Sequence, residues 1–185
     1  MSQSKKASTY VALLRGVNVG GKNKLPMAYL AKMFVDLGCD DVRTYIQSGN
    51  VVFRATEAKA KKLPGQIAGH LGLVFNYRVP VVVRSAAEMA VVIENNPFLK
   101  AGAFEETLHV LFLSTRPEAQ QIAALDPDRS PPDRFVVRDR EIYLELPNGV
   151  ADSKLTNAYF DSKLATMCTG RNWRTVMKLY EMMQG

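Results

Sequence analysis

Short apolar runs and helical stripes alternate along the first half of the chain. An apolar run of strand length, ended by Arg15-Gly16, indicates a strand buried on both faces, and apolar residues three and four positions apart then indicate one buried helix face. Two β-prone runs, separated only by Ser48-Gly49-Asn50, predict an antiparallel hairpin. The predicted elements are, in order, a strand at 10–14, a helix at 26–37, strands at 42–47 and 51–54, a helix at 57–71 and a strand at 78–84.

This order of elements, β-α-β-β-α-β, is that of the ferredoxin-like plait. In that fold a four-stranded antiparallel sheet carries both helices on one face. Within the second predicted helix, Pro64 and Gly65 interrupt the apolar pattern. We therefore expect that helix to be kinked or short.

The second half of the chain repeats part of this order. Its predicted elements are a strand at 108–113, a helix at 117–125, a hairpin of strands at 134–138 and 141–146, and two terminal helices after 147–149. We expect Asp152 or Ser153 to cap the first terminal helix and Asn172 to cap the second. Trp173 and Met177 then fall on the buried face of the second.

The predicted fold is therefore α+β, with two ferredoxin-like halves and extra C-terminal helices, in an N-terminal domain at 1–98 and a C-terminal domain at 99–185.

The net charge differs between the two halves of the chain. Residues 1–100 carry 14 lysines and arginines against 6 acids, residues 101–185 carry 10 against 12, and the first 35 residues contain no acid. A basic half favours a phosphate-bearing partner, although a solubilising charged surface explains the charge equally well.

Composition argues against several classes of protein and site. No apolar run approaches the roughly 20 residues needed to cross a bilayer, and the run that follows the N-terminal lysines is too short for a secretory signal. We therefore expect a cytoplasmic protein with no membrane partner. Cys39 and Cys168 are far apart and both histidines are isolated, which predicts reduced, packed thiols, no metal site and no cofactor. No familiar catalytic motif is present, so the sequence leaves open whether the protein is an enzyme.

The stretch from Arg15 to Pro26 is a glycine-rich basic loop between a predicted strand and a predicted helix. Such a loop can present backbone N–H groups and lysines to an anion, but paired glycines also serve a tight passage from strand to helix. Both interpretations stay open. The candidate ligand-binding residues in this loop are Arg15, Asn18, Gly20, Gly21, Lys22 and Asn23.

Two further polar segments are candidates for the same ligand. One is the hairpin turn, with Gln47, Ser48 and Asn50, in which Gln47 and Ser48 are more polar than a turn requires. The other is a set of polar residues at the starts of the two terminal helices, namely Lys154, Thr156, Asn157, Arg171 and Asn172. Capping and surface solvation are the simpler explanation for most of this second set. Topology alone leaves undecided whether the glycine loop and the hairpin turn lie close together.

Five motifs carry a resemblance to a known family. They are R-G-V-N-V-G-G-K-N-K-L-P-M at 15–27, Y-I-Q-S-G-N-V-V-F at 45–53, N-P-F at 96–98, K-L-T-N-A-Y-F at 154–160 and R-N-W-R-T-V-M-K-L at 171–179. With these motifs in order over nearly the whole chain, the sequence resembles the bacterial family known as the domain of unknown function 1697 (DUF1697). The resemblance implies an α+β fold of two plait-like halves, and it implies no activity.

Three functional hypotheses follow from the sequence. The first is binding of a phosphate-containing ligand, a nucleotide or a nucleic-acid backbone, through the glycine loop. The second is an enzyme that acts on a small anion held by Arg15, Lys154 or Arg171. The third is a structural or interaction module in which the polar residues only lock the fold. The sequence does not indicate an oligomeric state.

Overall fold

The structure is a computed structural model that describes residues 6–185. The first five residues, part of the stretch considered above as a secretory signal, lie outside the described part. Internal contacts group the chain into two compact units, one of Met1–Ala90 with Leu179–Gly185 and one of Val91–Lys178. The predicted boundary at residue 98 stays a prediction. Within the described residues, no helix combines the length and the apolar character needed to cross a membrane.

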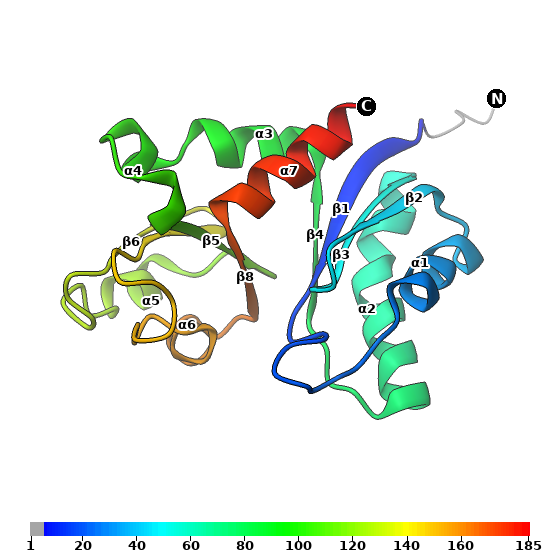
Figure 1. Ribbon diagram of the computed structural model, residues 1–185, viewed down its shortest axis with the longest axis horizontal. Helices are drawn as coiled ribbons and strands as arrows, with labels where there is room; N and C mark the ends of the chain where they lie inside the picture. Colours follow the sequence, from blue (N-terminus) through cyan, green and yellow to red (C-terminus); the bar gives the residue numbers. More distant parts are fainter. Residues whose placement is uncertain (1–5) are drawn as a thin grey trace. The chain divides into compact units, whose positions relative to one another are not determined.

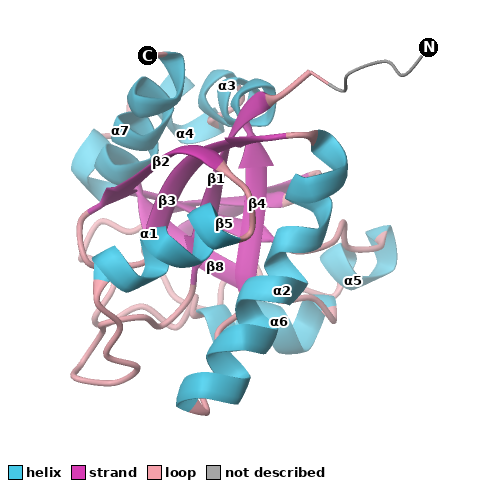
Figure 2. Ribbon diagram, turned by 90° about the vertical axis from the view of Figure 1, so that its right-hand side faces the viewer, coloured by secondary structure: helices cyan, strands magenta, loops and turns pink. Residues whose placement is uncertain are grey.

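The first unit contains a four-stranded antiparallel sheet with two helices on one face (Figure 1). Its elements are β1 (Ser8–Leu14), α1 (Met27–Asp36), β2 (Asp40–Tyr45), β3 (Asn50–Ala55), α2 (Glu57–Phe75) and β4 (Val81–Ser85), in the sheet order β2-β3-β1-β4. Figure 2 shows α1 and α2 in front of this sheet. The predicted ferredoxin-like plait is confirmed. Helix α2 runs through Pro64 for 19 residues, so of the two expected alternatives, a kinked or a short helix, the short helix was wrong.

Apolar residues of β1, β3, α1 and α2 form the core of this unit. Strand β1 lies between β3 and β4, and its residues Val11 to Leu14 have no exposed surface, as expected of a strand buried on both faces. Phe34 of α1 packs on Phe53 of β3, with ring centroids 5.1 Å apart. The glycine loop connects the end of β1 to the start of α1, and burial of the apolar stripe of α1 fixes the second of these two ends against the sheet.

The second unit repeats the plait. Its elements are α4 (Pro97–Lys100), a short 3-10 helix (Glu105–Thr107), β5 (Leu108–Leu113), α5 (Ala119–Ala123), β6 (Arg134–Arg138), β7 (Glu141–Glu145), α6 (Asn157–Leu164) and β8 (Cys168–Asn172), in the sheet order β6-β7-β5-β8. Helices α3 (Ala86–Glu94) and α7 (Trp173–Gln184) complete the secondary structure. The fold is therefore α+β with two ferredoxin-like halves, as predicted.

Strand β8 was not predicted. Its sequence C-T-G-R-N lacks the β-branched and aromatic residues typical of strands. Antiparallel pairing with β5, in which His109 lies opposite Asn172 and Leu111 opposite Gly170, makes it a strand. Helix α6, assigned above to a terminal pair, therefore takes the place of the second plait helix, and α7 is the helix that follows the plait.

The helix starts differ in part from the prediction. The side chain of Thr156, and not Asp152 or Ser153, accepts from the backbone N–H three residues on, at 3.2 Å, at the start of α6. Asn172 caps α7 as predicted, with its Oδ1 2.8 Å from the backbone N–H three residues on. Met177 was expected in the core but is 40% exposed.

Candidate functional site

The glycine loop and the hairpin turn lie at the same end of the first sheet. Because β1 and β3 are antiparallel, the end of β1 lies beside the start of β3. The N–H of Leu14 donates to the carbonyl of Gly49 at 2.8 Å, and the N–H of Arg15 donates to the carbonyl of Pro80 at 3.0 Å. The structure thus decides the question that topology left open. We call this region the loop end of the sheet, and it consists of residues 15–26, 46–49 and 76–80.

Asn18 ties the glycine loop to the hairpin turn. Its Nδ2 donates to the carbonyls of Leu25 and Gln47, both at 2.8 Å, and its Oδ1 accepts from the N–H of Leu25, also at 2.8 Å. The Nδ2 of Asn23 donates to the carbonyl of Gly16 at 3.0 Å. Both asparagines have positive φ, 55° and 46°, which asparagine tolerates better than most residues. The amides of these two candidate residues therefore hold the shape of the loop.

Asn50 has the same role in the hairpin turn. Its side chain is fully buried, and its Nδ2 donates to the carbonyl of Tyr45 at 3.1 Å and to the Oγ of Ser48 at 3.0 Å. Gln47 contributes its backbone carbonyl to Asn18, as described above. The side chains of Asn50 and Ser48 and the backbone of Gln47 thus hold this turn together.

The loop end carries cations and, within the described residues 6–90, no acid. Lys22, Lys24 and Arg78 are exposed there and Arg15 is half-buried. The hydroxyl of Tyr77 donates to the carbonyl of Lys24 at 3.1 Å, which brings the segment of Arg78 against the glycine loop. The acids of residues 6–90 all lie at the opposite end of the sheet, where α1 ends and β2, α2 and α3 begin: Asp36, Asp40, Asp41, Glu57 and Glu88.

The C-terminal candidates surround a cavity of about 360 Å³ in the second unit. The lining residues come from β5, β7, β8 and the segment that leads into α6: His109, Leu111, Leu144, Leu146, Val150, Ser153, Leu155, Thr156, Asn157, Gly170, Arg171 and Asn172. Four predicted site residues, Thr156, Asn157, Arg171 and Asn172, are therefore brought together. Lys154 is exposed and is not among the lining residues.

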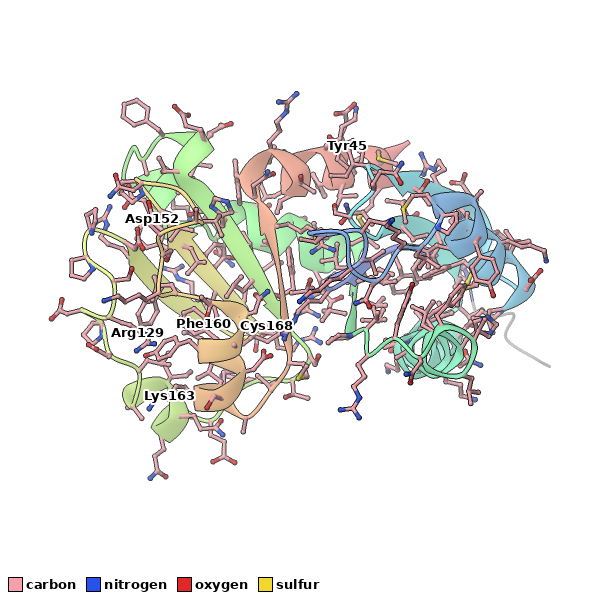
Figure 3. All side chains as sticks on the ribbon, turned by 60° about the horizontal axis from the view of Figure 1, so that its bottom comes forward. Tyr45, Arg129, Asp152, Phe160, Lys163 and Cys168 are labelled. Atoms are coloured by element: carbon pink, nitrogen blue, oxygen red, sulfur yellow. The ribbon has the colours of Figure 1, made fainter. Side chains whose placement is uncertain are left out.

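Helix α6 packs against β8 beside this cavity (Figure 3). Phe160 and Cys168, both labelled in Figure 3, belong to the apolar core between α6 and the second sheet. The Sγ of Cys168, a buried thiol, donates to the Oδ1 of Asn157 at 3.5 Å. This contact orients the amide of Asn157 at the start of α6.

Arg171 is buried although it is charged. It is 9% exposed, and its Nη1 donates to the Oγ1 of Thr169 at 2.9 Å and to the carbonyl of Gly170 at 2.7 Å. Burial lowers its pKa to about 10, so the guanidinium still carries its proton at neutral pH. Because side chains alternate along β8, Arg171 lies with Thr169 on the face opposite Gly170 and Asn172, so its guanidinium is directed away from the floor of the cavity.

Several lining residues were missed by the sequence reasoning, among them His109, Leu111 and Gly170. The strand period of two places His109 and Leu111 on one face of β5, which was a usable signal. However, the neighbouring strand β8 had not been predicted, so nothing in the sequence placed Gly170 beside them.

His109 is expected to make the second unit less stable in acid. Burial lowers the pKa of its imidazole from the ordinary 6.5, and a bond to the carbonyl of Thr107 acts more weakly in the opposite sense. The unfolded chain therefore binds this proton more readily than the folded one. Stability is full above about pH 6.5 and falls as the pH drops below it. Urea unfolding at pH 7.5 and pH 5.5, followed by the fluorescence of the single tryptophan, Trp173, measures this difference.

His109→Gln removes the titrating group and should flatten this dependence on pH. His70→Gln, in the first unit, is the control and should leave it as it is. An undiminished pH dependence in His109→Gln would contradict the assignment.

Comparison with known proteins found one matching family and a similar solved structure. The profile of a family described as "Protein of unknown function (DUF1697)" matches residues 7–143. The chain belongs to the DUF1697 family. In this DUF1697 protein the matched residues include the loop end and stop before the cavity residues from Leu144 onward.

One solved structure is similar to this DUF1697 chain over nearly its whole length. It is the conserved bacterial protein SP0830 from Streptococcus pneumoniae, with a TM-score of 0.71 and 23% identity, over 96% of this chain and 99% of that one. At this identity the likeness shows a shared fold alone. No curated protein matched the chain.

Proposed function

We propose that this DUF1697 protein binds a phosphate-containing ligand at the loop end of its first sheet, with a nucleic-acid backbone as the main case. The observation that carries the proposal is that the loop end carries cations and no acid of residues 6–90, whereas the acids at the other end lie beside cations, as in the pairs Lys32–Asp36 and Lys61–Glu57. A local excess of positive charge attracts phosphates and speeds their association.

The internal bonds of the glycine loop support this proposal. Val17 and Leu25 are buried and anchor the two sides of the loop, while Asn18 connects it to the hairpin turn. At the exposed tip, the N–H of Lys22 donates to the carbonyl of Val19 at 3.1 Å. A loop that is ordered before binding loses little conformational entropy when a ligand arrives.

The distribution of the cations favours an extended polyanion over a single nucleotide. Exposed cations come from two separate segments, Lys22 and Lys24 from the glycine loop and Arg78 from the chain before β4. Repeated phosphates can meet such spread charges one at a time. Contacts of this kind supply affinity without base specificity and weaken as salt is added.

Titration with fluorescent oligonucleotides over a salt series tests the proposal. We expect single-stranded or duplex oligonucleotide to bind at low salt. Replacing Lys22, Lys24 and Arg78 together by glutamine should lower the slope of log Kd against log salt by about 2 to 3, because three phosphate contacts are lost.

The matched control removes three exposed cations elsewhere, through Arg54→Gln, Lys62→Gln and Lys163→Gln, and gives the same net charge. This control should retain most of the slope. Equal losses in the two triple variants would mean that total charge and not the loop end drives binding. Absence of binding to either oligonucleotide at low salt would overturn the proposal.

A further inference from the structure

The cavity of the second unit has an apolar floor on the face of the sheet that α6 covers. The pairing of β5 with β8 sets His109 opposite Asn172 and Leu111 opposite Gly170, so these residues share one face. Leu144 of β7 lies opposite His109 and extends the floor. Gly170 keeps the space open, because a Cβ there would lie 2.8 Å from the Cδ2 of Leu111.

The polar side chains around this floor offer donors. Thr156 Oγ1 and Asn172 Oδ1 each accept from the backbone N–H three residues on, and Asn157 Oδ1 accepts from the thiol of Cys168. Their acceptor atoms are therefore occupied by the fold itself. Among residues 6–185, no acceptor pairs with the Nδ2 of Asn157 or of Asn172.

No acid lines the cavity, and the guanidinium of Arg171, the one lining residue with a permanent charge, lies on the other face of β8 beside Thr169. The positive end of the α6 dipole lies at Asn157, the first residue of this eight-residue helix. With no acid among the lining residues, the amide donors and the helix start together favour a negatively charged head group.

We propose that this cavity binds a small monocarboxylate with an unbranched apolar tail. Leu111, Leu144 and Leu155 hold the tail, and the Nδ2 groups of Asn157 and Asn172 donate to the carboxylate oxygens. A carboxylate suits this set because its oxygens only accept. The volume of about 360 Å³ lies in the range of small-molecule sites, roughly 300 to 1,000 Å³. This site is independent of the phosphate binding proposed for the first unit.

Calorimetry with three ligands that share one tail tests the head-group preference. Octanoate is expected to bind the intact protein and to change the fluorescence of Trp173, which directly follows Asn172. Octanol should bind more weakly, and octylammonium should not bind, because an ammonium only donates. Equal binding of all three, or no binding of octanoate at millimolar concentration, would overturn the proposal.

Asn157→Asp with Asn172→Asp separates binding from folding. Aspartate keeps the Oδ1 atom that accepts a hydrogen bond from Cys168 at position 157 and from the backbone N–H of Thr175 at position 172. It also serves as well as asparagine at a helix start. It replaces the donors by negative charge, so octanoate affinity should fall about tenfold or more. Gln120→Glu, on exposed α5, makes the same kind of charge change away from the cavity and should leave affinity unaltered.

Gly170→Val provides a second test that does not depend on charge. Its side chain would occupy the floor beside Leu111 and should remove octanoate binding. Unchanged octanoate affinity in either this variant or the double aspartate variant would refute the site.

Discussion

Replacing Gly49 by alanine is expected to destabilise the first unit by about 3 kcal/mol. Gly49 has φ 75°, a left-handed conformation that costs a residue with a Cβ about 1 to 2 kcal/mol. The new Cβ would also lie 2.8 Å from the Cβ of Leu14 and 3.4 Å from its carbonyl oxygen. Leu14 is fully buried in a central strand and cannot move aside, and overpacking of this kind adds roughly 1 to 3 kcal/mol.

Gly21→Ala is the matched control for Gly49→Ala. Gly21 has nearly the same φ, 74°, but nothing lies within 4 Å of a Cβ built there. It should cost about 1 kcal/mol, so the difference between the two substitutions measures the contact of the turn with β1. Urea unfolding followed by circular dichroism gives both values, and hydrogen exchange of the β3 amides assigns the loss to the first unit. Equal costs would refute the steric argument.

Phe53→Ala is expected to destabilise the first unit by about 4 kcal/mol. Phe53 has no exposed surface and lies in β3. Its ring is stacked on Tyr10 at 5.8 Å and tilted against Phe34 at 5.1 Å. Alanine would lose both aromatic contacts and leave a cavity between the sheet and α1 that these neighbours cannot fill.

The control for Phe53→Ala is Leu73→Ala, on α2 of the same unit. Leu73 is 91% exposed, so its truncation should change stability by less than about 0.5 kcal/mol. Urea midpoints of the two variants, compared with that of the unaltered protein, test the difference. A loss below 2 kcal/mol for Phe53→Ala would show that the core relaxes around the missing ring.

The polar candidate residues show where inference from sequence stops. Asn18, Asn23 and Asn50 were selected as polar residues of the glycine loop and the hairpin turn, and the structure shows all three bonded to backbone groups. An amide that closes a loop and an amide that binds a ligand use the same atoms. Residue type and spacing therefore cannot separate the two roles before the chain is folded.

The cavity shows a second limit. The sequence prediction already included Thr156, Asn157, Arg171 and Asn172. It did not predict the strand residues that form the floor of the cavity beside them. That floor depends on β8, whose residues have no strand pattern of their own. The pairing of Leu111 with Gly170 joins positions far apart in the chain, and local propensity carries no information about it.

By itself the sequence determined the order of elements in the first plait, the repeat of that plait in outline, and the basic character of the first half. These properties are local, because apolar spacing and turn residues act over a few neighbouring positions. Only the tertiary structure decided that the loop end gathers cations away from the acids, that Asn18 bonds to Gln47 across 29 residues, and that Cys168–Asn172 is a strand. Each of these depends on contacts between distant segments, which form only when the core is buried.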